Sequence, residues 1–143
     1  MAEAAKPNVY SIAAHRGFAD ALVAGLVPRY ADPELGLARL TLLLLVSHVR
    51  ASNFRGKGDF HMDGRGRLTR RRSGRIAPFI FTGIQLIAKR LLRDAPQGPF
   101  STNLLWTRAI EEGRLYGTAF TGEWFEVGDP QAIAPTEAAL AGA

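Results

Sequence analysis

The chain has 143 residues, of which 47% are hydrophobic, and this length suits one globular domain better than two. It contains no cysteine, which excludes disulfides and thiolate metal sites and fits a reducing, cytoplasmic compartment. The formal net charge is +5, and no apolar run approaches the ~20 residues of a membrane span, so we expect a chain without membrane association.

The first forty residues predict two short helices. Residues 1–7 lack the apolar stretch and cleavage site of a signal peptide. From Gly17 to Val27 apolar side chains recur at the spacing of one helix face, and Pro28 should end this helix. Pro33 and Glu34 fit the first turn of a second helix, where proline is tolerated and an acid is favourable.

A buried strand and a hairpin are predicted next. Leu40 to Val46 is an apolar run of strand length, and a polar loop follows from Arg50 to Lys57. Residues Asp59 to Asp63 alternate polar and apolar, as a half-buried strand does. Turn residues at 63–66 then lead to a return strand at 67–69.

Two Gly-x-Gly spacings, Gly56/Gly58 and Gly64/Gly66, invite comparison with a phosphate-binding turn. Such a turn is followed by a helix, whose first backbone N–H groups bind the phosphate. Both pairs lead instead into predicted strands, so we interpret them as hairpin turns. We find no nucleotide-binding turn in the sequence.

Asp59, His61 and Asp63 share one face of the predicted strand and are candidates for a metal site of oxygen and imidazole ligands. Side chains two residues apart stand ~7 Å from each other along a strand. Three of them cannot reach one ion without further help, so an exposed polar face is the preferred interpretation.

Further along, Ile76 to Ile87 predicts a strand that passes into a helix ending near Arg93. Gly83 inside this run indicates either a close approach of another group to the backbone or a bulge. Asn103 to Glu112 predicts a helix that Gly113 ends.

The carboxyl-terminal part predicts two strands and a helix. The strands, Leu115 to Thr121 and Glu123 to Val127, are joined tightly through Gly122. Pro130 opens a final helix rich in alanine.

Basic residues concentrate in the middle of the chain. Arg50 to Arg93 contains twelve of them and only two acids. The densest stretch, Arg65 to Arg75, suits a phosphate backbone, so a basic nucleic-acid-binding module is an alternative function. This stretch has no aromatic side chains to stack bases, and a solvated hairpin end is the other interpretation.

Five segments together resemble a known family. They are Asn53–Phe60, Pro78–Gln85, Gly98–Asn103, Gly113–Gly117 and Gly122–Pro130. In this order, from about residue 43 to 143, the chain resembles the C-terminal half of a bacterial sugar-1-phosphate nucleotidyltransferase, closest to the N-acetylmuramate 1-phosphate uridylyltransferase group. The resemblance implies an α/β class: a truncated nucleotidyltransferase (Rossmann-like) fold, with a mixed sheet and flanking helices behind a short helical leader.

The resemblance also implies a reaction, one of peptidoglycan recycling. A sugar 1-phosphate attacks the α-phosphorus of a nucleoside triphosphate and pyrophosphate leaves, while Mg²⁺ stabilises the charge. Glu126 falls at the metal-ligand position, where the family usually has aspartate. The longer side chain moves the carboxylate by ~1.5 Å, and Mg²⁺ demands near-ideal octahedral geometry. Asp129, where the family commonly has threonine, is a candidate to compensate.

Other residues match the sugar-binding positions of the family. Gly58, Thr82 and Gly83 fall where backbone or small side chains meet the sugar, and Trp124 falls beside that pocket. One of the arginines at 70–72 lies near the position of a basic group close to the sugar phosphate. A tryptophan at a strand end is more often part of the hydrophobic core than a ligand contact, and Glu126 by itself is also consistent with a surface carboxylate.

Residues 1–44 show a different resemblance. The segments Asn8–Ile12, Gly17–Leu22 and Leu37–Leu44 resemble the extreme N-terminus of AddB, a subunit of a double-strand-break repair helicase-nuclease. We therefore divide this chimeric chain into an AddB-like leader, 1–42, and a nucleotidyltransferase-like part, 43–143. An AddB-related interaction segment is a further alternative function, without nuclease chemistry.

The nucleotide-binding turn and the second metal aspartate of the family have no counterpart in this sequence. We therefore expect no catalysis by this polypeptide alone. We also expect the sheet to have open edges, through which the chain self-associates.

Overall fold

The computed structural model describes residues 20–21, 23–24 and 41–142. Asp20, Ala21, Val23 and Ala24 are helical, in agreement with the first predicted helix. The second predicted helix, at Pro33, lies outside the described residues.

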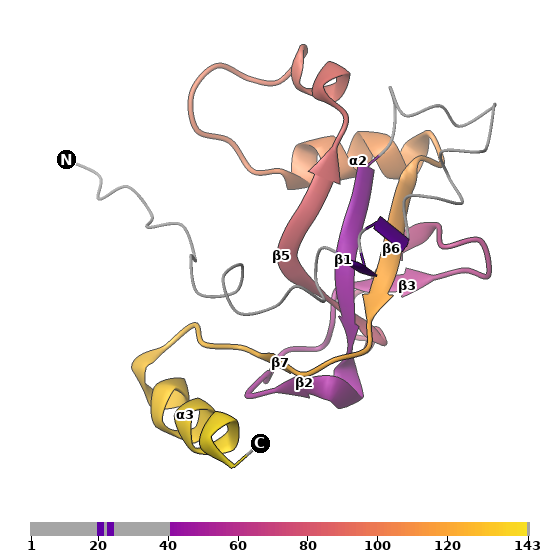
Figure 1. The fold of residues 1–143 in the computed structure, drawn as a ribbon. Coiled ribbons are helices and arrows are strands. Elements are labelled where there is room, and N and C mark those ends of the chain that lie inside the picture. Colours follow the sequence, from indigo (N-terminus) through magenta and orange to yellow (C-terminus); the bar gives the residue numbers. More distant parts are fainter. Residues whose placement is uncertain (1–19, 22, 25–40, 143) are drawn as a thin grey trace.

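The described part contains a five-stranded mixed sheet and a separate two-stranded one (Figure 1). The strands are β1 (Thr41–Ser47), β2 (Ala51–Ser52), β3 (Phe60–Met62), β4 (Leu68–Arg70), β5 (Phe79–Ile87), β6 (Leu115–Phe120) and β7 (Trp124–Phe125). The large sheet has the order β4-β3-β5-β1-β6, and β2 pairs with β7. This mixed sheet confirms the α/β class predicted from the sequence.

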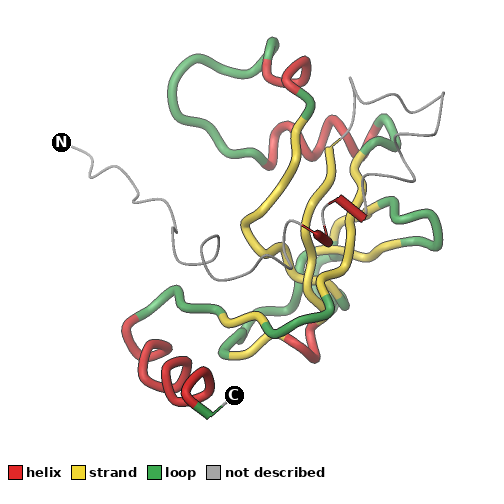
Figure 2. The backbone as a smooth tube through the Cα atoms, in the orientation of Figure 1, coloured by secondary structure: helices red, strands yellow, loops and turns green. Residues whose placement is uncertain are grey.

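Helices flank the sheet at its ends and on one face. They are α2 (Asn103–Glu111) and α3 (Ile133–Ala141), with short 3-10 helices η3 (His48–Arg50), η4 (Lys89–Leu92) and η5 (Pro130–Ala132). In Figure 2 the loop between η4 and α2 extends away from the sheet, and α3 lies at the periphery. No helix in the described ranges is long and apolar enough to cross a membrane.

The strand β1 lies inside the sheet, between β5 and β6. It pairs with β5 in antiparallel and with β6 in parallel orientation. Its five residues from Leu42 to Val46 are 0% exposed, which confirms the buried strand predicted from the apolar run. Because side chains alternate along a strand, β1 supplies both faces of the sheet with hydrophobic groups.

Two hydrophobic clusters result, one on each face. The first contains Leu42, Leu44, Val46, Ile80, Phe120 and Trp124. The second contains Leu43, Leu45, Phe60, Leu68, Trp106, Ala109 and Leu115. Trp106 comes from α2, contacts the rings of Phe60 and Phe81 edge-on, and donates its indole N–H to Gln85 at 2.8 Å. The helix α2 therefore covers the second cluster.

The predicted hairpin is present as β3 and β4, with the return strand at 68–70 rather than 67–69. Its turn is organised by Asp63, whose Oδ1 accepts the backbone N–H groups of Arg65 at 2.8 Å and Arg67 at 2.9 Å. Arg67 also forms an ion pair with this carboxylate at 3.1 Å. The hairpin directs Phe60 and Leu68 into the second cluster.

The turn end of the β3–β4 hairpin reaches β6, the strand at the opposite end of the strand order. Arg67 forms a bridge to Tyr116 of β6, and the Gly117 N–H donates to the Gly66 carbonyl at 2.8 Å. Gly117 packs against Leu45 and Leu68. A Cβ on Gly117 would stand 2.6 Å from Leu45 Cδ1 and 2.8 Å from Leu68 Cδ2. The end of the hairpin therefore covers part of the outer side of β6, while self-association through open sheet edges stays a prediction.

The helix predicted to end near Arg93 is present as the 3-10 helix η4, which ends at Leu92. Two other elements differ from the prediction. The Arg50–Lys57 loop contains β2, which pairs in parallel with β7. The strands β6 and β7, although joined through Gly122, therefore belong to different sheets.

Arg70 should stabilise the docking of α2 on the hairpin. Its guanidinium donates to the Asn103 side chain at 2.9 Å, to the Asn103 carbonyl at 3.1 Å and to the Thr107 hydroxyl at 3.1 Å. We expect Arg70→Ala to lower the free energy of unfolding by about 1 kcal/mol, measured by urea denaturation. Arg72→Ala is the matched control, because the exposed Arg72 side chain makes no such bond. Equal losses in both variants would contradict this role.

The turn should also respond to pH. The backbone hydrogen bond from Arg67, together with that from Arg65 and the Arg67 guanidinium, lowers the pKa of Asp63. A lowered pKa in the folded state gives stability that is present at neutral pH and lost as the carboxylate protonates. We expect the urea midpoint to fall as the pH drops below the unperturbed value of 3.8 toward the lowered pKa, and to fall less in Asp63→Asn. The exposed acid Glu137, changed to glutamine, should leave the pH profile as in wild type.

Candidate functional site

The parallel pair β1 and β6 brings two loops together at the carboxyl ends of both strands. Arg50, just after β1, donates to the Thr121 carbonyl just after β6 at 2.7 Å. Farther along, Ser52 accepts the Glu126 N–H at 2.9 Å, next to the β2–β7 pair. In α/β folds ligands bind outside the carboxyl ends of the strands, so the end of the sheet where β1 and β6 finish is the candidate site.

Glu126 follows β7 at this edge and is half-buried. Its carboxylate has no hydrogen-bond or ion-pair partner in the part of the chain that the structure describes. The carboxylate lies over Gly128, where a Cβ would stand 2.9 Å from Oε1. The absence of a side chain at Gly128 therefore leaves room for the Glu126 carboxylate.

Asp129 has a structural explanation. Its Oδ1 accepts the Ala132 N–H at 3.0 Å, which caps η5 at the helix start. Side-chain acceptors at this position satisfy N–H groups that have no partner within the helix. This bond uses the carboxylate that we considered as a compensating metal ligand.

Trp124 is 7% exposed and belongs to the first hydrophobic cluster. Its backbone pairs with Ala51 of β2. The structure thus favours the core interpretation of this residue over a direct sugar contact. Trp124 fixes the segment that carries Glu126 to the sheet.

Gly58 occupies a position that only glycine suits. Its φ is 79°, and a Cβ would stand 2.1 Å from the Ala77 carbonyl oxygen. Around it, Ala77 donates its N–H to Lys57 at 2.8 Å, and Arg71 donates Nε to the Gly58 carbonyl at 3.0 Å. Close backbone packing alone therefore explains this glycine.

Thr82 and Gly83 form a bulge in β5. The register places Leu43 opposite Gln85 and Leu45 opposite Phe81, so residues 82–84 face one residue of β1. The Thr82 hydroxyl is buried and donates to the Leu44 carbonyl at 2.9 Å. Gly83 has a φ of 90°, and its missing side chain would meet open space. Of the two interpretations of Gly83, the bulge is confirmed.

Gly58 and Glu126 lie on different loops near the carboxyl end of β1. Gly58 lies beside Ala77, just before β5 pairs with the end of β1, and Glu126 lies beside Ser52. Gly83 stands opposite Leu44, about three residues or ~10 Å back along the strand. Gly83 therefore lies along the β1–β5 pair, Gly58 lies beside the start of β5, and Glu126 lies next to the separate β2–β7 pair.

The three polar residues of the hairpin do not form a metal site. The Asp59 carboxylate accepts the Phe81 N–H at 2.9 Å, the Asp63 carboxylate organises the turn, and His61 is exposed. Within residues 20–21, 23–24 and 41–142, no group of three His, Asp or Glu side chains could hold a metal ion.

The arginines near the expected sugar phosphate differ in their surroundings. Arg70 binds α2, and Arg71 donates to three backbone carbonyls, those of Gly58, Arg72 and Arg75. Both therefore have structural partners. Arg72 is exposed, and its side chain has no hydrogen-bond or ion-pair partner among the residues that the structure describes.

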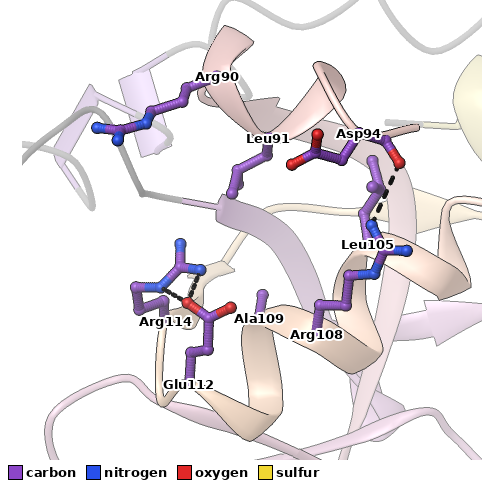
Figure 3. A pocket seen from close by; sticks show the side chains of 8 residues that line it. All are labelled: Arg90, Leu91, Asp94, Leu105, Arg108, Ala109, Glu112 and Arg114. Atoms are coloured by element: carbon purple, nitrogen blue, oxygen red, sulfur yellow. Dashed lines mark hydrogen bonds and ion pairs between the residues drawn. The ribbon is translucent and has the colours of Figure 1, made fainter.

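A cleft of about 270 Å³ lies elsewhere, at the amino end of β6 (Figure 3). Its walls come from η4, α2 and the residue before β6, and it is lined by Arg90, Leu91, Asp94, Leu105, Arg108, Ala109, Glu112 and Arg114. An ion pair joins Arg114 to Glu112, and Arg108 donates to the Asp94 carbonyl at 3.4 Å. The candidate residues do not line this cleft.

Comparison with known proteins gives one informative match. No protein-family model matches the chain. The chain is 37% identical over 99 residues to an N-acetylmuramate alpha-1-phosphate uridylyltransferase of Caulobacter vibrioides, and these residues are 69% of this chain. The chain spans 41% of the length of that relative. This similarity supports a nucleotidyltransferase-like character for the matched part, while the resemblance of residues 1–44 to AddB stays a prediction.

Replacement of Gly58 should test the close packing. We expect Gly58→Ala to lower the free energy of unfolding by at least about 3 kcal/mol, since it adds a backbone clash to the cost of a positive φ. Gly74→Ala is the control, because Gly74 has a φ of 72° but open space around it. That variant should lose only about 1 kcal/mol in urea denaturation. Equal losses would show that the Ala77 contact relaxes.

Proposed function

We propose that residues 43–143 form the sugar-binding part of a nucleotidyltransferase of the sugar-1-phosphate uridylyltransferase type. We base this on the identity to the Caulobacter uridylyltransferase. The location of Gly58 and Glu126 outside the carboxyl ends of parallel strands supports it, because α/β folds bind ligands there. In the reaction, a phosphate oxygen of the sugar 1-phosphate attacks the α-phosphorus of the nucleoside triphosphate, and the bond to pyrophosphate breaks.

Glu126 is the residue that we propose for Mg²⁺. A single carboxylate fits this ion, because Mg²⁺ sites commonly combine one or two carboxylates with water and substrate phosphates. The half-buried position of Glu126 and the lack of a partner for its carboxylate in the described part support this role. The ion, when bound, would neutralise charge on the phosphates.

The remaining candidates divide into two roles. We propose that Gly83 presents backbone groups to the sugar, since it is exposed and faces open space, whereas the buried Gly58 would act indirectly by keeping its loop against Ala77. Thr82 and Trp124 would act indirectly. The Thr82 hydroxyl holds the bulge through Leu44, and Trp124 anchors the strand before Glu126.

We propose that this polypeptide binds sugar phosphate but does not catalyse the transfer. The sequence contains no glycine-rich turn that leads into a helix, the arrangement that binds nucleotide phosphates. It also offers one metal carboxylate at the candidate site rather than two. A cytoplasmic location suits these substrates and stays a prediction.

Calorimetric titration with N-acetylmuramate 1-phosphate tests the site. We expect Mg²⁺ to strengthen binding about tenfold, or ~1.4 kcal/mol, and Glu126→Gln to abolish this effect. Glu123→Gln is the control, because it removes an exposed carboxylate three residues earlier. Pyrophosphate release from UTP with this sugar should stay at background.

Two outcomes would contradict the proposal. Absence of sugar-phosphate binding, with or without Mg²⁺, would argue against the sugar-binding role. Pyrophosphate release above background would show that the polypeptide is active alone.

A further inference from the structure

Exposed cationic side chains gather on two loops near the start of β5. The loop 54–58 carries Arg55 and Lys57, and the loop 71–76 carries Arg72 and Arg75. The loops lie side by side, because Ala77 donates its N–H to the Lys57 carbonyl at 2.8 Å. We call these two loops together the basic surface. Their side chains are separated by many residues in the sequence, so the sequence alone does not group them.

Arg71 holds the basic surface together. Its guanidinium donates to the carbonyls of Gly58 at 3.0 Å, Arg75 at 3.1 Å and Arg72 at 3.4 Å. These acceptors belong to both loops, so one side chain fixes their relative position. All three are neutral carbonyls, so the charge of Arg71 adds to that of its neighbours.

The four exposed cations lack acidic partners. In the described part of the chain, ion pairs join Arg67 to Asp63 and Arg114 to Glu112, and neither pair involves these loops. Asp59, the acid next to Gly58 in the sequence, directs its carboxylate to the Phe81 N–H. The basic surface therefore keeps an uncompensated positive charge, which attracts polyanions.

We infer that the basic surface binds the phosphate backbone of double-stranded nucleic acid. Side chains that extend from two exposed loops suit an array of phosphates better than a single small anion, which needs converging donors. The loops also offer no exposed aromatic ring, since Phe54 is half-buried and packs edge-on against His48. Without aromatic rings to stack on, the bases of a single strand would add little binding free energy.

The exposed basic residues in the structure are not the same set as the basic run Arg65 to Arg75 noted in the sequence. Within the run Arg65 to Arg75, Arg67 is paired with Asp63 and Arg70 is bonded to α2. Arg72 and Arg75 remain, and they combine with Arg55 and Lys57 from the preceding loop. The basic surface includes Arg72 and the loop that carries Gly58, both named for the sugar site, so the competition experiment below distinguishes the two ligands.

The number of cations sets the expected salt dependence. Each neutralised phosphate of a DNA duplex contributes a slope of about −0.9 to the plot of log affinity against log salt. Four cations therefore predict a slope of about −3 to −4 for wild type.

Fluorescence anisotropy with a short labelled DNA duplex of mixed sequence tests the inference. The variant Lys57→Gln, Arg72→Gln, Arg75→Gln should lose at least about tenfold in affinity at low salt, and its slope should shrink by about 2 to 3. The control variant Lys89→Gln, Arg90→Gln, Arg93→Gln removes the same charge after the other end of β5. It should keep the wild-type slope to within about 1. Urea denaturation of both variants checks that they are folded.

Several results would overturn the inference. One is an equal loss of affinity in the two triple variants, since net charge alone would then explain binding. Another is duplex binding that does not change with salt. Preference for vesicles of anionic lipid over the duplex would point to a membrane surface instead. Displacement of the duplex by N-acetylmuramate 1-phosphate, at the concentration where that sugar binds, would make the basic surface part of the sugar site.

Discussion

The described structure depends on the complete burial of β1. This strand has partner strands on both sides and hydrophobic clusters on both faces. A continuous run of leucines can be buried on both faces, whereas alternating polar and apolar residues would bury polar side chains on one face. Its parallel partner is β6, so both strands end at one edge. Their continuations then pair as β2 and β7, and Glu126 follows. The position of the candidate carboxylate is thus a consequence of how the core strand is packed.

Local patterns in the sequence predicted where helices and strands lie better than they predicted which strands pair with each other. The apolar run of β1, the alternation of Asp59 to Asp63 and the stop at Gly113 each depend on neighbouring residues, and all three are confirmed. The β2–β7 pair and the contact of the hairpin with β6 join segments far apart in the chain. Such pairings depend on tertiary packing, which periodicity does not encode.

The candidate site was predictable only in part. A glycine motif indicates that the backbone needs glycine, but Gly58 is required by Ala77 and Gly83 by a bulge, whether or not sugar binds. The structural roles of Arg70 and Arg71 could not be predicted for a similar reason. Both donate chiefly to backbone or neutral side-chain oxygens, which any sequence supplies, so no acidic partner in the sequence indicates these bonds. Glu126 differs from these residues, since its carboxylate has no structural partner in the described part.

The terminal helix α3 contributes no buried side chain. Among the described residues, one hydrogen bond joins it to the loop after β2, from the Asn53 amide to the Thr136 hydroxyl at 3.0 Å. Segments with few buried apolar contacts open at low free-energy cost, independently of the global transition. Amide protons of α3 should therefore exchange with solvent long before those of β1, and a protease could remove this helix while both hydrophobic clusters stay intact.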